Sequence, residues 1–443
     1  MAVPVSGSEI AVKYGVSNHL KYAVYLPAVQ PQYARGVVQN NYTQSLPHGL
    51  TVSDLNYLKG GSKLFDIHAA LYSAGHIGNH RKSPPCMIST RPRGRKQNTF
   101  VVGDSGGYQI ATGQLKMTPT KREEIYDWLT RTCDVSMTLD VPVWALGTDK
   151  MSGYDTFEDC LYGTIEHLDV FRALGAENHR FLNVLHGRSI EEADTWYDAV
   201  KHFSFYGWAM GGNLRPEANC SHGDQTPFSM MLWRIVTMLR DGMFDRDQVW
   251  IHFLGVGDLK TALLLTTLKN TLNQMLSCCR VEITYDTSSP SQLARFLSGL
   301  SSFDASKTKL CYKTINVDKE LWADNGLSLP FVSSTISKYL AMGDVIKRTM
   351  RGELIVRDLG YLILENNNVE AIIGVIDAAH KILNSGLSRV QLDQVFPYHL
   401  LDAQDAIEKV LTQQTVKKAK EVLMSPVTQA HLSNAYNNVK CIG

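Results

Sequence analysis

The sequence predicts an α/β fold, namely a (β/α)8 TIM barrel with an N-terminal elaboration and a C-terminal helical subdomain. From Phe100 onward, short apolar runs alternate with longer helical stretches, which is typical of parallel strands joined by crossover helices. The chain of 443 residues is long enough for one large barrel with an added subdomain. The motifs described below also follow the apolar runs, at the strand ends where TIM barrels carry their active sites.

Six strand–helix units follow one another in this part of the chain. The predicted strands are Phe100–Gly103, Val135–Asp140, Arg180–Leu185, Tyr206–Met210, Val249–Leu254 and Val281–Tyr285. The predicted helices are Lys121–Thr132, Tyr154–Leu174, Ile190–Phe203, Pro227–Arg240 and Asp258–Cys278. Two upstream strands would complete the barrel, and the candidates are Tyr22–Leu26, Lys63–Ala74 and Cys86–Thr90. The sequence leaves open which of these three belong to it.

We divide the chain into three parts. Residues 1–98 hold the N-terminal elaboration and the first strands, residues 99–300 the barrel core, and residues 301–443 a mixed and helical subdomain. Pro290–Leu300 is predicted to be the crossover helix of the last unit. The helices predicted beyond it are Tyr361–Leu364, Val369–Leu383 and Asp402–Leu423, the last carrying a solvated lysine face.

Composition excludes several classes of protein. The formal net charge is only +1, so any nucleic-acid surface must be a local patch. The N-terminus lacks the pattern of a signal peptide, and the longest apolar run, Thr261–Leu268, is too short to span a bilayer. Eight scattered cysteines form no even framework, which indicates reduced thiols and a cytoplasmic location.

One hexapeptide, Asp104-Ser105-Gly106-Gly107-Tyr108-Gln109, follows the first predicted barrel-core strand. An acid and two glycines at this point place a carboxylate at a strand end where the backbone turns tightly. Glycine at these positions permits positive φ or a close approach of a ligand to the backbone. An ordinary strand-to-loop turn with a capping Asp is the alternative interpretation.

Five further motifs follow in order, each at the carboxyl end of an apolar run. They are Leu139-Asp140-Val141-Pro142, Asn183-Val184-Leu185-His186-Gly187, Ala209-Met210-Gly211-Gly212, Phe253-Leu254-Gly255-Val256-Gly257 and Ile283-Thr284-Tyr285-Asp286. Together with the hexapeptide, they resemble the motifs of the tRNA-guanine transglycosylase (queuine tRNA-ribosyltransferase) superfamily, over roughly residues 100–286. In character the chain is closest to the relatives that insert 7-deazaguanines into DNA in phages and bacterial genomic islands.

The resemblance implies two catalytic carboxylates. Asp286 matches the family's nucleophile and Asp104 its general acid/base. A carboxylate suits attack at a glycosidic carbon, because it forms a covalent sugar ester after stabilising oxocarbenium character. Two carboxylates in one site also shift each other's pKa values apart, so that one can serve as acid or base while the other stays ionised. Each could alternatively be a strand-end Asp that accepts loop hydrogen bonds.

The resemblance also implies a set of base-binding residues. Asp140 would accept from N1–H and the exocyclic amine of a guanine-like ring, and His186, in place of the family's Gln, could donate to O6. Tyr108 and Leu254 would sandwich the ring, although core packing is the alternative. The remaining predicted base-binding residues are Ser105, Gly211, Gly212 and Asn213.

The chain departs from the family in two respects. Only Cys311 and Cys441 lie beyond Asp286, so the family's structural zinc is predicted to be absent, and no cofactor is expected. The arginines that follow the family's nucleophile are also missing, which favours DNA over tRNA as the polynucleotide. Predicted phosphate contacts come from basic residues of loop 81–96 and from later positions. They are Arg81, Lys82, Arg91, Arg93, Arg95, Lys96, Arg295, Lys307, Lys309, Lys313, Lys347, Arg348 and Arg351.

These observations predict a glycosyltransferase that exchanges guanine in DNA for a free 7-deazaguanine base. The alternatives are a divergent queuine-type enzyme acting on tRNA, and a catalytically silent accessory subunit that binds the base. No membrane partner is expected, a homodimer is left open, and the location is the cytoplasm, or the host cytoplasm if the gene is phage-borne.

Overall fold

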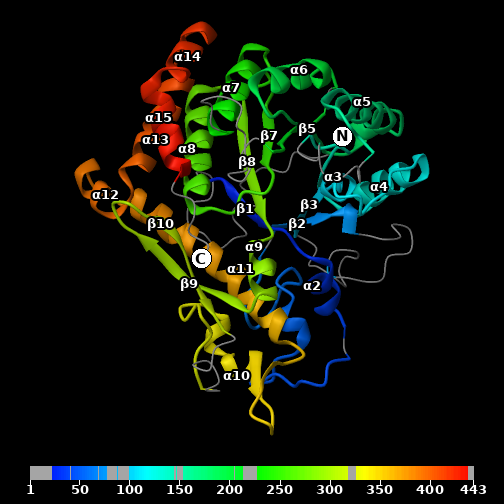
Figure 1. Cartoon of the computed structure of the whole chain (residues 1–443), viewed down its shortest axis with the longest axis vertical. Coiled ribbons are helices and arrows are strands. Elements are labelled where there is room, and N and C mark those ends of the chain that lie inside the picture. The colour runs from blue at the N-terminus through cyan, green and yellow to red at the C-terminus, as the bar shows by residue number, and fades with distance from the viewer. Residues whose placement is uncertain are drawn as a thin grey trace.

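The eight-stranded parallel sheet of this protein curls into a nearly closed barrel flanked by helices (Figure 1). It is seen in a computed structural model that describes residues 22–39, 41–67, 69–76, 87, 99–143, 146, 153–203, 205–212, 227–317 and 326–437. The predicted (β/α)8 TIM barrel with C-terminal helices is therefore confirmed. No helix in these ranges is both long enough and apolar enough to cross a membrane.

The barrel strands pair in the order β1-β8-β7-β6-β5-β4-β3-β2. Their bounds are β1 Val24–Pro27, β2 Ala69–Ser73, β3 Phe100–Asp104, β4 Val135–Met137, β5 Phe181–Leu185, β6 Gly207–Met210, β7 Gln248–Phe253 and β8 Arg280–Thr287. An isolated parallel bridge between Ala28 and Leu71 joins the two edge strands. The amide of Val29 donates to the carbonyl of Leu71 at 2.9 Å, so the sheet comes close to complete closure.

Five of the six predicted barrel-core strands lie within two residues of their expected bounds. The exception is Val135–Asp140, where β4 ends at Met137 and pairing continues only through the amide of Thr138. Upstream, Tyr22–Leu26 becomes β1, and Lys63–Ala74 contributes β2 only through Ala69–Ser73. Except for Met87, the third candidate, Cys86–Thr90, lies outside the described residues.

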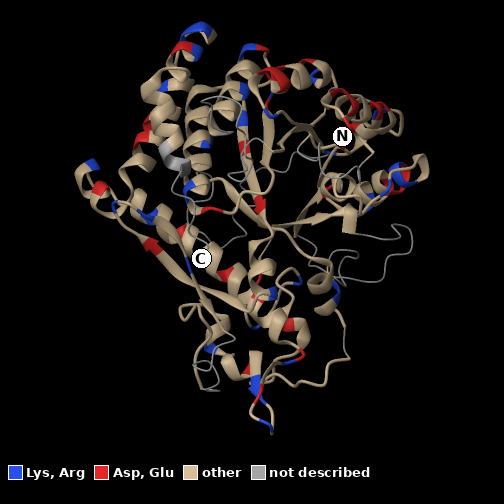
Figure 2. Ribbon diagram, in the orientation of Figure 1, with Lys and Arg blue, Asp and Glu red and all other residues tan. Residues whose placement is uncertain are grey.

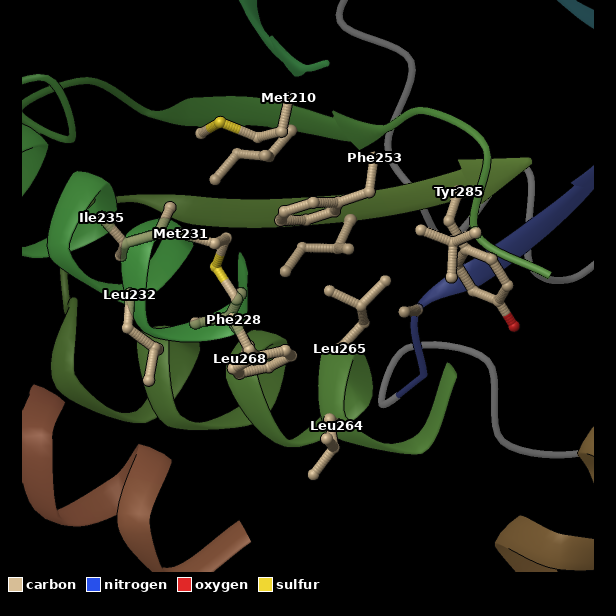
Figure 3. Packing of buried hydrophobic residues seen from close by; sticks show 14 of the residues in the cluster. Met210, Phe228, Met231, Leu232, Ile235, Phe253, Leu264, Leu265, Leu268 and Tyr285 are labelled. Atoms are coloured by element: carbon tan, nitrogen blue, oxygen red, sulfur yellow. The ribbon is translucent and has the colours of Figure 1, made fainter. Parts of the chain in front are cut away.

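Side chains alternate between the interior of the barrel and the surrounding helices. Twelve buried residues form the interior cluster, among them Val102 of β3, Val184 of β5 and Trp250 of β7. Their sequence neighbours pack outward, as Figure 3 shows for Phe253 of β7 and Tyr285 of β8 against the flanking helices. Because this alternation continues to the strand ends, it decides which side chains face the mouth of the barrel.

The helices between the strands follow the expected order. Their bounds are α3 Gly107–Ala111, α4 Pro119–Thr132, α5 Phe157–Ala173, α6 Ile190–Val200, α7 Pro227–Arg240 and α8 Leu259–Met275. Thr118, Ser189 and Asp258 cap α4, α6 and α8 by accepting from backbone amides of the first turn, which fixes where these helices begin. Burial of a large apolar side chain such as Leu265 of α8 contributes roughly 1.5–3 kcal/mol.

An inserted segment separates β8 from the long helix α11, Gly360–Leu383. It begins with α9, Ser289–Arg295, where the sequence predicted a helix over Pro290–Leu300. That prediction is wrong after Arg295, because Leu297 adopts a positive φ of 49° and β9 starts at Ser298. The rest of the segment comprises β9 Ser298–Ala305, β10 Leu310–Asn316, a 3-10 turn Ile336–Lys338, α10 Met342–Val345, β11 Ile346–Arg348 and β12 Leu354–Val356.

The C-terminal helices pack on α7 and α8, at the upper left of the barrel in Figure 1. They are α12 Arg389–Val395, α13 Tyr398–Leu411, α14 Val416–Leu423 and α15 Pro426–Asn437. The prediction of a single helix over Asp402–Leu423 is wrong, because α13 ends at Leu411 and Thr415 caps the next helix, α14. The N-terminal part adds α2 Pro31–Gly36 and 3-10 turns Val52–Leu55 and Ala74–His76; another 3-10 turn, Ala176–Asn178, precedes β5.

Helix α11 is continuous where the sequence predicted two helices, Tyr361–Leu364 and Val369–Leu383. The polar run Glu365–Asn368 resembles a break, yet all four side chains are buried. Asn366 donates to the hydroxyl of Tyr33 and to the carbonyl of Leu55. Asn367 and Asn368 form hydrogen bonds with backbone groups of the inserted segment. The helix therefore continues through this polar run, and the run holds the inserted segment in place.

Glu365 provides a test of this buried run. Burial raises the pKa of this carboxyl from 4.5 to about 8, despite a hydrogen bond with Ser291. Between these two pH values the folded protein holds a proton that the unfolded chain has released, so stability falls as pH rises. We expect Glu365→Gln to match the wild type below about pH 4.5 and to exceed its unfolding free energy by on the order of a few kcal/mol above about pH 8.

Urea unfolding across this pH range measures the difference. Glu421→Gln, which changes an exposed carboxyl on α14, is the matched control and is expected to show no such pH-dependent gain. A constant gap between wild type and Glu365→Gln over the whole range would contradict the buried, protonated carboxyl.

Candidate active site

Three carboxylates and one histidine lie at the carboxyl ends of four barrel strands. Asp104 is the last residue of β3, and Asp286 is the penultimate residue of β8. His186 follows β5 directly, and Asp140 lies three residues beyond β4. The alternation of Phe100 and Val102 into the barrel interior turns Asp104 inward as well. The same end of the barrel therefore brings together four of the predicted site residues, three from neighbouring strands and Asp286 from β8.

The two glycines of the hexapeptide have separate roles. Gly106 adopts a positive φ of 95°, and a Cβ there would lie 2.6 Å from the Cα of Gly75. Gly107 opens α3, and a Cβ there would lie 2.8 Å from both carboxylate oxygens of Asp140. The predicted positive φ is confirmed at Gly106, whereas the group that lies close to Gly107 is a carboxylate of the protein and not a ligand. The turn therefore lays the backbone directly against the Asp140 carboxylate.

Asp140 is buried and hydrogen-bonded at both oxygens. The hydroxyl of Ser105 donates to Oδ1 at 3.2 Å, and Nε2 of His186 lies 2.7 Å from Oδ2. His186 is only 2% exposed, and its other nitrogen, Nδ1, is buried without a partner in the described part of the chain. Only Nδ1 of this imidazole is therefore left for a ligand, and Gly211 faces the ring because a Cβ there would lie 2.5 Å from Cε1.

Asp286 is held by donors from the neighbouring strand β7 and its loop. Nε2 of His252 lies 3.2 Å from Oδ1, and the amide of Gly255 donates to the same oxygen at 2.9 Å. Sequence reasoning missed His252, because a single histidine inside the apolar run of β7 resembles a core residue. The available signal was its position two residues before Leu254, which places it on the inward face of the strand.

Asp104 differs from its two neighbours. Burial is the largest cause that raises the pKa of this carboxyl from 3.8 to about 6. A hydrogen bond from Ser73 opposes the shift, whereas the negative charges of Asp140 and Asp286 add to it. A carboxyl with a pKa near neutrality can both donate and accept a proton at physiological pH. This behaviour is what general acid–base chemistry requires.

The other predicted base-binding residues fare differently. Tyr108 is 47% exposed in the first turn of α3, and Leu254 packs against the top of the barrel interior. The amide of Gly211 donates to the carbonyl of Leu185 within the sheet and is already paired, while the role of Gly211 in base binding stays a prediction. Gly212 follows it, and Asn213 lies outside the described residues.

The predicted phosphate contacts of loop 81–96 lie outside the described residues, whereas the seven later ones are described. Arg81, Lys82, Arg91, Arg93, Arg95 and Lys96 all lie outside the described residues. Arg295 is exposed at the end of α9, shortly after Asp286. Within the described ranges, no group of three or more His, Cys, Asp or Glu side chains is arranged to hold a metal ion.

No protein-family model matches the chain, and no curated protein matches it significantly.

The hexapeptide turn can be tested by stability. Gly106→Ala combines a left-handed backbone with a clash against the backbone of Gly75, and we expect it to lower the unfolding free energy by about 3 kcal/mol. Gly153→Ala is the matched control, because Gly153 has a φ of 77° with nothing within 4 Å of the added Cβ. We expect only about 1 kcal/mol for this variant. Equal losses in urea unfolding would show that the close approach to Gly75 is unimportant.

Proposed function

We propose that this protein is a DNA-guanine transglycosylase, which exchanges guanine in DNA for a 7-deazaguanine base through a covalent Asp–sugar intermediate. The observation that carries the proposal is the set of three carboxylates at one end of the barrel, where burial raises the pKa of Asp104 to about 6. The ordered resemblance of the motifs to the tRNA-guanine transglycosylase superfamily supports it.

The reaction divides into two balanced halves. In the first, a carboxylate oxygen of Asp286 bonds to C1′ of the deoxyribose while the C1′–N9 bond breaks, and its electron pair leaves with the guanine. Asp104 gives its proton to the departing base. In the second half, the nitrogen of the incoming base bonds to C1′, the ester bond to Asp286 breaks, and the released proton returns to Asp104.

Recognition of the base rests on Asp140 and His186. An ionised carboxylate has about four acceptor sites, so the bonds from Ser105 and His186 leave capacity for N–H groups of a guanine edge. Nδ1 of His186 is the buried polar atom in this site that a ligand would satisfy. Tyr108 offers an exposed aromatic face for stacking on the flat ring.

The polynucleotide would lie along the inserted segment beyond β8. Lys347, Arg348 and Arg351 are exposed on the β11–β12 hairpin, which projects at the bottom of the view in Figure 2. Lys307, Lys309 and Lys313 are exposed on and near the β9–β10 hairpin. Exposed cations on projecting hairpins favour contact with phosphates rather than with base edges. The target base would leave the stack to enter the barrel mouth.

The decisive experiment is a base-exchange assay. The purified protein is incubated with DNA or tRNA and with labelled guanine, 7-cyano-7-deazaguanine or 7-aminomethyl-7-deazaguanine. We expect label to enter DNA, and Asp286→Ala to abolish its incorporation because this variant lacks the carboxylate that would form the sugar ester.

Each other outcome contradicts part of the proposal. Label in tRNA alone would make this a queuine-type enzyme. Binding of the free base without exchange would indicate a silent accessory subunit, a different class of protein. Exchange that survives in Asp286→Ala would reject the assigned nucleophile.

The pKa of Asp104 makes a second prediction about the first half-reaction. The rate of covalent adduct formation should fall as pH rises above about 6, by about tenfold per unit once the acid is ionised, because the departing base then lacks its proton donor. Denaturing gels of single-turnover mixtures measure the adduct. Asp104→Asn should lower the rate by about 10²–10⁴-fold and remove this pH dependence. An unchanged wild-type rate well above pH 6 would exclude Asp104 as the acid.

A further inference from the structure

A buried hydrogen-bonded chain runs from the centre of the barrel to Asp286. The indole Nε1 of Trp250 donates to Oγ1 of Thr284 at 2.9 Å, and Nδ1 of His252 lies 2.9 Å from the same oxygen. Nε2 of His252 then reaches Oδ1 of Asp286. These side chains alternate along two adjacent strands, with His252 of β7 level with Thr284 of β8. No site residue predicted from the sequence except Asp286 belongs to this chain.

Counting donors and acceptors assigns the protons of this hydrogen-bonded chain. Trp250 can only donate, so it occupies one acceptor site on the Thr284 hydroxyl. An ionised Asp286 can only accept, so the proton between His252 and Asp286 is on Nε2. A neutral His252 therefore accepts at Nδ1, and the Thr284 hydroxyl supplies that proton. With His252 neutral and Asp286 ionised, one arrangement satisfies all these groups, with His252 as the Nε2–H tautomer.

The chain also distinguishes the two oxygens of Asp286. Oδ1 accepts from both His252 and the amide of Gly255, whereas the structure describes no donor on Oδ2. A donor on an attacking oxygen lowers its nucleophilicity, while a donor on the other oxygen stabilises charge and fixes the rotation of the carboxylate. The free oxygen is thus the more reactive one.

We propose that His252 is a positioning residue for the nucleophile, held as the Nε2–H tautomer by Thr284 and Trp250, and that Oδ2 of Asp286 is the atom that attacks the sugar. This inference rests on the proposed function. His252 does not touch the substrate in this arrangement, and it acts by holding the Asp286 carboxylate in one rotation. In the balanced reaction given above, the bond to C1′ is formed and later broken at Oδ2.

The interior of the barrel keeps this chain rigid. His252 and Trp250 are fully buried, and Thr284 is nearly so. The indole of Trp250 stacks on the ring of Phe100 across the barrel, with centroids 5.3 Å apart and planes only 9° from parallel. The start of the chain is therefore anchored by core packing, and its end by the backbone amide of Gly255.

The test compares two substitutions at one position. His252→Gln keeps an N–H donor toward Asp286, whereas His252→Leu removes it. We expect His252→Leu to lower the single-turnover rate of adduct formation about 10- to 100-fold with KM for DNA within about twofold, and His252→Gln to retain most of the rate. Thr284→Val, which frees the tautomer, should lie between the two. Equal impairment of both His252 variants, or none in His252→Leu, would overturn the proposal.

A second readout does not depend on activity. Nitrogen-15 NMR of histidine-labelled protein reports the tautomer of His252, with His252→Gln used to assign its signal. We expect a protonated Nε2 and an unprotonated Nδ1, and the reverse pattern would overturn the proposal. If the wild type exchanges no base at all, the proposed function fails, while this measurement still decides the hydrogen-bonded chain.

Discussion

Three buried carboxylates at one end of a barrel repel one another, and the structure depends on how that repulsion is relieved. Asp286 receives donors from His252 and Gly255, and Asp140 receives donors from His186 and Ser105. Burial and the charges of the other two carboxylates raise the pKa of Asp104 to about 6. Three residues of one type thus have three different surroundings, which is what the proposed nucleophilic, binding and acid–base roles require.

The strand ends of the barrel core could be predicted because each coincides with a local signal. Asp104 and Asp286 follow β-branched apolar runs. Gly106 marks a turn that requires a positive φ, which glycine adopts readily. Such signals depend on neighbours in the sequence. The choice of Ala69–Ser73 as β2 depends instead on pairing with β3, thirty residues away, and on the bridge to Ala28. The sequence of a short apolar run does not show which distant strand it will pair with.

Several sequence predictions failed at buried polar residues for the same reason, namely that their partners lie far away in the sequence. His252 sits in an apolar run and acquires its partner only when β8 aligns beside β7. The asparagines of α11 predict a break in the helix when they are considered alone, because Asn competes with the backbone in solution. In the fold the side-chain NH2 of each asparagine donates to a backbone carbonyl of another segment, and these buried hydrogen bonds reverse the preference.

These two groups of polar residues are physically connected through α9. Asp286 lies three residues before α9, and Asn368 of α11 donates to the carbonyl of Pro290 in its first turn. Glu365, one helical turn earlier in α11, hydrogen-bonds with Ser291 of the same turn. The segment that carries the nucleophile is thus held from the barrel side by His252 and from the outside by α11. Because the same asparagines also bind Leu300 of β9 and Phe331, α11 connects the β9–β10 hairpin to the segment that carries Asp286. In the proposed reaction, a polynucleotide bound on that hairpin would therefore be held in a fixed position relative to the Asp286 carboxylate.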